Sequence, residues 1–177
     1  MKFRYTVIVL AVVIFINSEL VHSQKLTGIG LNGGYTVPTG QVQKGFGVEV
    51  HADFNEVLKY LFIFPSIAYW QNDFTEGDYS LQRSHFNFGA KFIGYFNRKP
   101  KGLYAGIGLY YHFIGNETRN DFTAEITTQN EQKLGFSILA GYLLRFKRFS
   151  LFLEPRYSLI HGGYNTFQAY LGFTYYF

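Results

Sequence analysis

The chain has 177 residues, enough for one domain, and it has no cysteine, which excludes a disulfide scaffold, a thiolate metal site, thiol chemistry and a lipid anchor on an N-terminal cysteine. Aromatic residues make up 20% of the chain and charged residues 16%, whereas ordinary soluble domains have about 25% charged residues. A mean hydropathy of −0.02 excludes a helical membrane protein, and the net charge of +4 comes without the basic, aromatic-interleaved patch that a nucleic-acid partner would require.

The N-terminal segment is typical of an export signal. Two basic residues precede an apolar run over residues 6–16, which is too short to cross a bilayer as a helix, and a more polar stretch follows. We therefore expect a signal peptide over residues 1–23, cleaved before Gln24, and one exported domain over residues 24–177. The alternative is an N-terminal helix buried in the folded domain.

Further along, eight stretches alternate with period two, which predicts β-strands with two distinct faces. One face is apolar and the other is small, polar or charged, except in the third stretch, where both faces are apolar and the orientation stays open. Pro65 and Pro155 would each remove a ladder hydrogen bond, so a bulge or bend is expected at both. The stretches are residues 26–37, 45–54, 60–71, 81–96, 102–114, 133–146, 149–159 and 166–177.

Charged residues within these stretches fall on one face only. A charge that faces lipid near the middle of a membrane costs about 2–4 kcal/mol, so we expect the charge-free face to contact lipid and the other face to line a lumen. This predicts an all-β fold, an eight-stranded antiparallel up-and-down transmembrane β-barrel preceded by a cleaved signal peptide. A soluble, secreted ligand binder of the lipocalin type is one alternative, and it would need polar residues outside and an apolar pocket inside. Aromatic residues near strand ends are expected to form interfacial girdles: Tyr69, Trp70, Phe113, Tyr175 and Phe177.

The predicted connections alternate in length, as short periplasmic turns and longer outer loops do in bacterial barrels. Residues 72–80 and 115–132 are expected to be outer loops and are candidate sites for a protein or surface ligand. Part of 115–132 also alternates, so the flanking strands could protrude as a hairpin. The short turns are residues 55–59, 97–101 and 147–148, and basic side chains in the last two are expected either to meet anionic lipid headgroups or to keep the turns hydrated.

The lumen face carries ionisable side chains from most of the strands. Because eight strands enclose a space that side chains can just fill, and buried charges must be paired, we expect a bonded polar network in the lumen. A narrower alternative is an ion path or gate centred on Glu154 and Arg156. The predicted network is Glu49, His51, Asp53, Arg83, His85, Lys91, His112, Lys133, Arg145, Glu154 and Arg156.

No catalytic, cofactor-binding or metal site is predicted. The histidines of the exported domain lie on different strands and lack the short spacing of metal ligands. Ser158, His161 and Glu154 lie close in sequence, but His161 has the opposite parity to the other two, so a base–nucleophile contact is not implied. An outer-membrane lipid-modifying hydrolase is the second alternative function.

The last strand, residues 166–177, ends on Phe177 with Phe173 and Tyr175 on the same face, and it resembles the C-terminal strand of bacterial outer-membrane β-barrel proteins. With the signal segment and the alternating strands, residues 24–177 resemble small barrels of the PorT-like and OmpA/OmpX-like kind. The resemblance implies a Gram-negative outer membrane, contact with outer-membrane lipids, periplasmic chaperones, and a barrel assembly machinery that reads the three aromatic residues of the last strand. It implies a non-enzymatic barrel that serves envelope structure or surface interaction through its outer loops, and it transfers no specific activity.

Overall fold

The computed structural model describes residues 25–39, 44–54, 56–97, 99–120, 122–123 and 125–177. The expected signal segment over residues 1–23 lies outside these residues. No helix in the described part of the chain is long and apolar enough to span a membrane. The strands are β1 (Gly28–Pro38), β2 (Gly45–Asp53), β3 (Glu56–Leu58), β4 (Leu61–Glu76), β5 (Tyr79–Tyr95), β6 (Gly102–Asn120), β7 (Glu125–Arg145), β8 (Phe149–Ile160) and β9 (Thr166–Tyr176).

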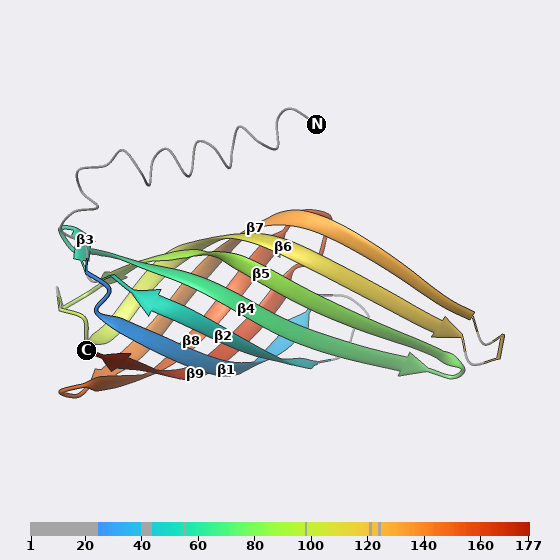
Figure 1. Cartoon of the computed structure of the whole chain (residues 1–177), viewed down its shortest axis with the longest axis horizontal. Helices are drawn as coiled ribbons and strands as arrows, with labels where there is room; N and C mark the ends of the chain where they lie inside the picture. The colour runs from blue at the N-terminus through green and yellow to red at the C-terminus, as the bar shows by residue number, and fades with distance from the viewer. Residues whose placement is uncertain (1–24, 40–43, 55, 98, 121, 124) are drawn as a thin grey trace, which may run out of the picture.

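The strands form one closed antiparallel barrel (Figure 1). Successive strands pair with each other from β4 to β9, β9 pairs with β1, and β2 pairs with both β1 and β4, which closes the ring. The three-residue β3, which the sequence did not predict, pairs with the start of β4 and leaves the barrel with eight full strands. The predicted fold class is therefore confirmed.

Burial alternates along the strands as the sequence pattern predicts. In β8 every second residue from Ser150 to Ile160 is buried and the residues between are exposed. The outward face is apolar, with Leu171 on β9 67% exposed, whereas the interior holds charged side chains. The interior is also crowded, because a Cβ at Gly34 would lie 2.3 Å from the carbonyl oxygen of Ala169 on the neighbouring strand.

Burial also settles the orientation of the third predicted stretch, which became β4. Phe62, Phe64, Ser66, Ala68 and Trp70 point into the barrel. Placing Trp70 in an interfacial girdle was therefore wrong, since its side chain is fully buried in the lumen. The space is available because Trp70 lies opposite Gly47, where a Cβ would lie 2.7 Å from the Cβ of Trp70.

The bulges expected at the two prolines are absent from the described ladders. Pairing keeps one register through Pro65 against β5 and through Pro155 against β9. On the other side of each proline, pairing with the second neighbouring strand is missing. The β2–β4 pairing ends at Ser66, next to Pro65, and the β7–β8 pairing is interrupted opposite Pro155. A missing N–H on one side can be accommodated in this way without an extra residue.

The predicted outer loops were wrong in their boundaries, because most of residues 72–80 and 115–132 is strand. The alternative prediction, that the strands flanking residues 115–132 protrude as a hairpin, is confirmed. β4 and β5 continue to a tight turn in which Gly77 has a φ of 59°, and β6 and β7 pair out to Asn120 and Glu125. Polar residues on both faces remove the apolar alternation there although the ladder continues. We call residues 73–84, 115–120 and 125–134 the outer sheet, which projects beyond the other strands (Figure 1).

The outer sheet has a free edge on each side within the described residues. β8 pairs with β7 only from Gly135 onward, and β2 pairs with β4 only as far as Asn72. We call this end of the barrel the hairpin end. The opposite end, which holds the connections of β2 to β4, β5 to β6 and β7 to β8 together with Lys25 and Phe177, is called the turn end.

Candidate functional site

Four charged side chains join across the middle of the lumen. Arg156 donates to Glu49 at 2.8 Å and 3.2 Å and to Glu154 at 2.5 Å. Lys91 donates to Glu49 at 2.8 Å and lies 3.6 Å from Glu154. None of the four is more than 3% exposed. Since they come from β2, β5 and β8, this central quartet ties together strands on different sides of the barrel.

Neutral side chains complete the central quartet, and sequence reasoning missed all of them. Asn32 donates to Glu49 at 2.8 Å, and the Tyr104 hydroxyl donates to Glu154 at 3.0 Å. The guanidinium of Arg156 lies 5.4 Å from the ring centre of Tyr110 and 4.8 Å from that of Tyr170. The sequence feature that could have identified them is their position in the alternation, because all four lie on the strand face that carries the charges.

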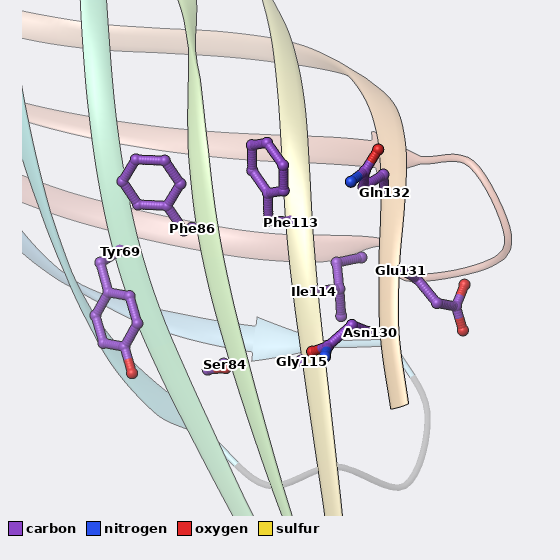
Figure 2. Close-up of a pocket in the computed structure, with 9 residues that line it drawn as sticks. All are labelled: Tyr69, Ser84, Phe86, Phe113, Ile114, Gly115, Asn130, Glu131 and Gln132. Carbon is purple, nitrogen blue, oxygen red and sulfur yellow. The ribbon is translucent and has the colours of Figure 1, made fainter. Parts of the chain in front are cut away.

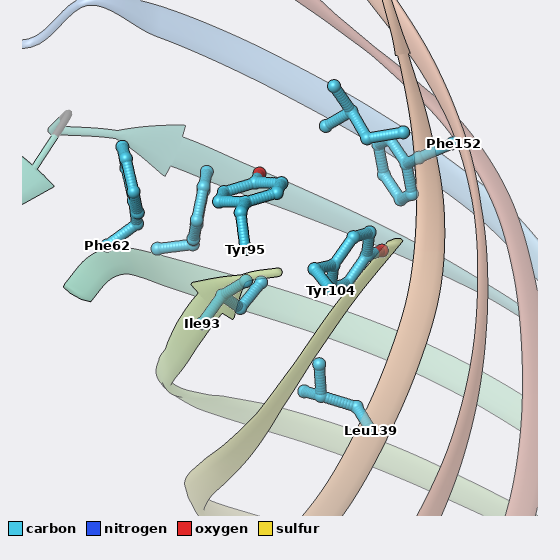
Figure 3. Close-up of a cluster of buried hydrophobic side chains, with 8 residues drawn as sticks. Phe62, Ile93, Tyr95, Tyr104, Leu139 and Phe152 are labelled. Atoms are coloured by element: carbon cyan, nitrogen blue, oxygen red, sulfur yellow. The ribbon is translucent and has the colours of Figure 1, made fainter. Parts of the chain in front are cut away.

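An apolar layer fills the lumen between the central quartet and the turn end. It contains the buried side chains Phe62, Phe64, Ile93, Tyr95, Tyr104, Leu139, Leu143 and Phe152, most of which are labelled in Figure 3. His51 lies at its border, where Nε2 is 3.1 Å from the Thr174 hydroxyl and the ring packs edge-on against Phe64 and Phe152. The lumen is thus closed by side chains on this side.

The lumen on the hairpin side of the central quartet holds aromatic and imidazole rings. Trp70 stacks on His85 with ring centres 3.4 Å apart, and His85 lies 6.4 Å from His112. Ile114 and Ile160 pack against Trp70. The ring nitrogens of Trp70, His85 and His112 are buried without a hydrogen-bond partner among the described residues, so this half of the lumen contains polar atoms as well as apolar side chains.

The remaining predicted network residues lie near the two ends of the lumen and not in its centre. Asp53 accepts from Thr27 at the turn end, and the exposed Arg145 stacks 3.6 Å from the ring centre of Tyr176. At the hairpin end, Arg83 donates to Asn116 and lies over Tyr164, and Lys133 pairs with Glu131 at 2.7 Å. Hydrogen bonds from Lys133 and Tyr164 lower the pKa of Glu131 below its ordinary value.

A pocket of about 480 Å³ lies on the four long strands where the outer sheet begins (Figure 2). The rings of Tyr69, Phe86 and Phe113 come from three adjacent strands, and Asn130 and Gln132 contribute amides from β7. Apolar rings and neutral amides therefore meet in one depression at the base of the projecting strands.

The residues considered for a hydrolase do not form a catalytic arrangement. Ser158 is buried in the lumen, 2.8 Å from the Ser137 hydroxyl and 3.5 Å from Gln168. His161 is exposed in the turn after β8. No group of three or more metal-ligating side chains occurs in the described part of the chain.

These features define a small closed β-barrel with an apolar exterior and a lumen filled by paired charges and rings. No family model matches the sequence, and no curated protein does. Among solved structures the chain is similar to Ail, the attachment invasion locus protein of Yersinia pestis, with a TM-score of 0.58 and 13% identity over 86% of this chain and 100% of that one.

Two further structures show the same fold. Neisserial surface protein A has a TM-score of 0.57 and 13% identity, covering 85% of this chain and 96% of that one. A major outer membrane protein from Thermus thermophilus has a TM-score of 0.60 and 12% identity, covering 85% of this chain and 99% of that one. The fold of this chain is therefore that of small bacterial outer-membrane β-barrels.

Proposed function

We propose that the chain is a non-enzymatic integral outer-membrane barrel of a Gram-negative bacterium, exported by the expected signal peptide. The observation that carries the proposal is the inverted polarity of the barrel. Large apolar side chains are exposed all around the outer face, while Glu49, Lys91, Glu154 and Arg156 are buried and paired inside. Lipid is the solvent that this exterior suits. A lipocalin-type binder would need the reverse polarity.

The lumen serves structure in this proposal. The central quartet bonds strands across the barrel, and buried side chains pack in the lumen on both sides of it. An ion path or gate would require Arg156 to leave two carboxylates at once, so the bonded arrangement favours a closed barrel over a conducting one.

Surface interaction is the role we propose for the outer sheet. It offers two free strand edges, to which an extended segment of a partner can add by backbone hydrogen bonding. Its exposed acidic residues, which include Glu76, Asp78, Glu117 and Glu125, favour a neutral or basic partner. Ail has been crystallised with the heparin analogue sucrose octasulfate, but an anionic ligand of that kind would be repelled here.

Biogenesis through periplasmic chaperones and the barrel assembly machinery is part of the same proposal. Phe173, Tyr175 and Phe177 are exposed on the outward face of the last strand, which leaves them accessible to an assembly factor. The hydrolase alternative is disfavoured by the separation of Ser158 from His161. Unchanged folding and lipid composition after alanine replacement of both residues would end it.

Fractionation of cells that express the full chain tests the proposal. We expect the protein in the outer-membrane pellet after an alkaline carbonate wash. We also expect the unboiled protein to migrate differently from the boiled protein on a denaturing gel, because a closed barrel resists detergent until heated. Release into a soluble fraction would contradict membrane insertion.

A further inference from the structure

Exposed cations gather at the turn end of the barrel. They come from the segment before β1, from the last residue of β7 and from each of the three short connections, and all of them are exposed. The carboxylates of the same segments are the buried Asp53 and the exposed Glu56. The turn-end cations are Lys25, Lys59, Lys99, Lys101, Arg145, Lys147 and Arg148.

Two neighbouring turns carry the densest part of this charge. Lys99 and Lys101 precede β6, Lys147 and Arg148 follow β7, and these strands pair from Gly102 and Leu143 onward, so the two turns emerge side by side. None of the four cations forms an ion pair with another described residue. The ion pairs among the described residues involve the cations Lys91, Arg156 and Lys133, which lie elsewhere in the barrel. Their charge is therefore available to an external anion.

Exposed aromatic rings lie beside these cations. Phe96 is 73% exposed in the same turn as Lys99, and Phe146 stacks on Phe149 with ring centres 4.5 Å apart across the turn that holds Lys147 and Arg148. Aromatic rings are typical of the membrane–water interface, and long basic side chains there extend their charge toward the headgroups. A soluble polyanion would account for the cations but not for the exposed rings beside them.

The opposite end of the molecule has the opposite sign of charge. The outer sheet carries an excess of carboxylates, whereas the charges of the central quartet cancel within the lumen. Its acidic residues are Asp73, Glu76, Asp78, Glu117, Glu125 and Glu131, and its basic residues are Arg83, Arg119 and Lys133. Attraction to anionic headgroups is therefore confined to one end of the barrel, and it acts on the leaflet that surrounds that end.

From the unpaired cations, the adjacent rings and the charge asymmetry, we propose that Lys99, Lys101, Lys147 and Arg148 form a binding surface for the phosphate groups of anionic phospholipids in the leaflet around the turn end. This inference rests on the proposed membrane insertion. To membrane insertion it adds the class of lipid that is bound and the leaflet in which it is bound. It implies that the bound lipid fixes how deeply the turn end sits at the membrane–water interface.

Lipid binding by matched variants tests the proposal. The full-length protein is expressed, extracted from membranes with detergent and titrated with phosphatidylglycerol or phosphatidylcholine, and bound lipid is counted by native mass spectrometry. We expect a preference for phosphatidylglycerol that weakens with salt. The double variant Lys147→Gln/Arg148→Gln should lower the affinity for phosphatidylglycerol by roughly fivefold or more, as expected for loss of basic side chains near an anionic lipid surface.

The control variant Lys44→Gln/Arg119→Gln removes the same charge from exposed positions near the hairpin end and should leave the preference unchanged. Equal binding of both lipids by the folded wild-type barrel would overturn the inference while leaving membrane insertion intact, and so would an equal loss in both double variants. A protein found only in the soluble fraction would overturn the proposed function itself, and this inference with it.

Discussion

Replacing Arg156 by methionine is expected to lower the free energy of unfolding by about 3–5 kcal/mol, because it leaves buried carboxylates without their main partner. Arg156 binds both Glu49 and Glu154, which are 0% and 1% exposed, and among the described residues Lys91 would be the one cation left beside them. The measurement is urea unfolding of the barrel in lipid vesicles, followed by the emission of Trp70, the single tryptophan of the chain.

Two further variants separate this effect from the simple loss of a side chain. The exposed Arg119→Met should change stability by less than about 1 kcal/mol. Adding Glu154→Gln to Arg156→Met restores charge balance in the lumen, so the double variant should be more stable than the single one. A loss below about 1 kcal/mol in Arg156→Met would mean that the central quartet does not hold the barrel together.

Placing arginine at Ile107 is the second substitution with a large expected effect. Ile107 lies on the outward face of β6, 43% exposed, and pairs with Phe92 and Ile138 within the apolar belt. In a membrane, an arginine there should cost about 2–4 kcal/mol in the same unfolding measurement.

The matched control is Ile126→Arg on the outer sheet, where Ile126 is 58% exposed. Water surrounds that position in the proposed arrangement, so the change should stay within about 0.5 kcal/mol. In a soluble protein the two exposed isoleucines would tolerate arginine equally well. Equal and small effects would therefore show that the belt around Ile107 does not face lipid.

The fold could be predicted from the sequence because the two sides of each strand meet different surroundings. Where one face is apolar and the other carries charge, as around Glu154 and Arg156, the alternation gives both the strand and its facing. This contrast weakens in β4, where the lumen face itself is apolar. It vanishes in the outer sheet, where both faces carry polar residues, so the sequence pattern predicts loops over residues 72–80 and 115–132 although the ladder continues through them.

The candidate site was less predictable, since parity gives the face of a residue but not its partner. The central quartet depends on strand register, which brings Glu49 of β2 to Arg156 of β8 across the lumen. The two residues are far apart in the sequence, so a local sequence pattern does not show that they are in contact. Neutral partners such as Asn32 and Tyr104 carry no charge signal. Arg145 and Lys133 lie on the predicted lumen face, but they are so near the ends of the barrel that they contact Tyr176 and Glu131 there and not the central quartet.

Spin-label accessibility measures whether the apolar face of the barrel contacts lipid. Because the chain has no cysteine, Leu171→Cys on the outward face of β9 and Ile126→Cys on the outer sheet each give one labelling site. In vesicles, we expect the label at position 171 to collide with oxygen and to be shielded from a water-soluble nickel complex. The label at position 126 should show the reverse. Equal access of the nickel complex to both labels would show that the outward face at position 171 is in water and does not contact lipid.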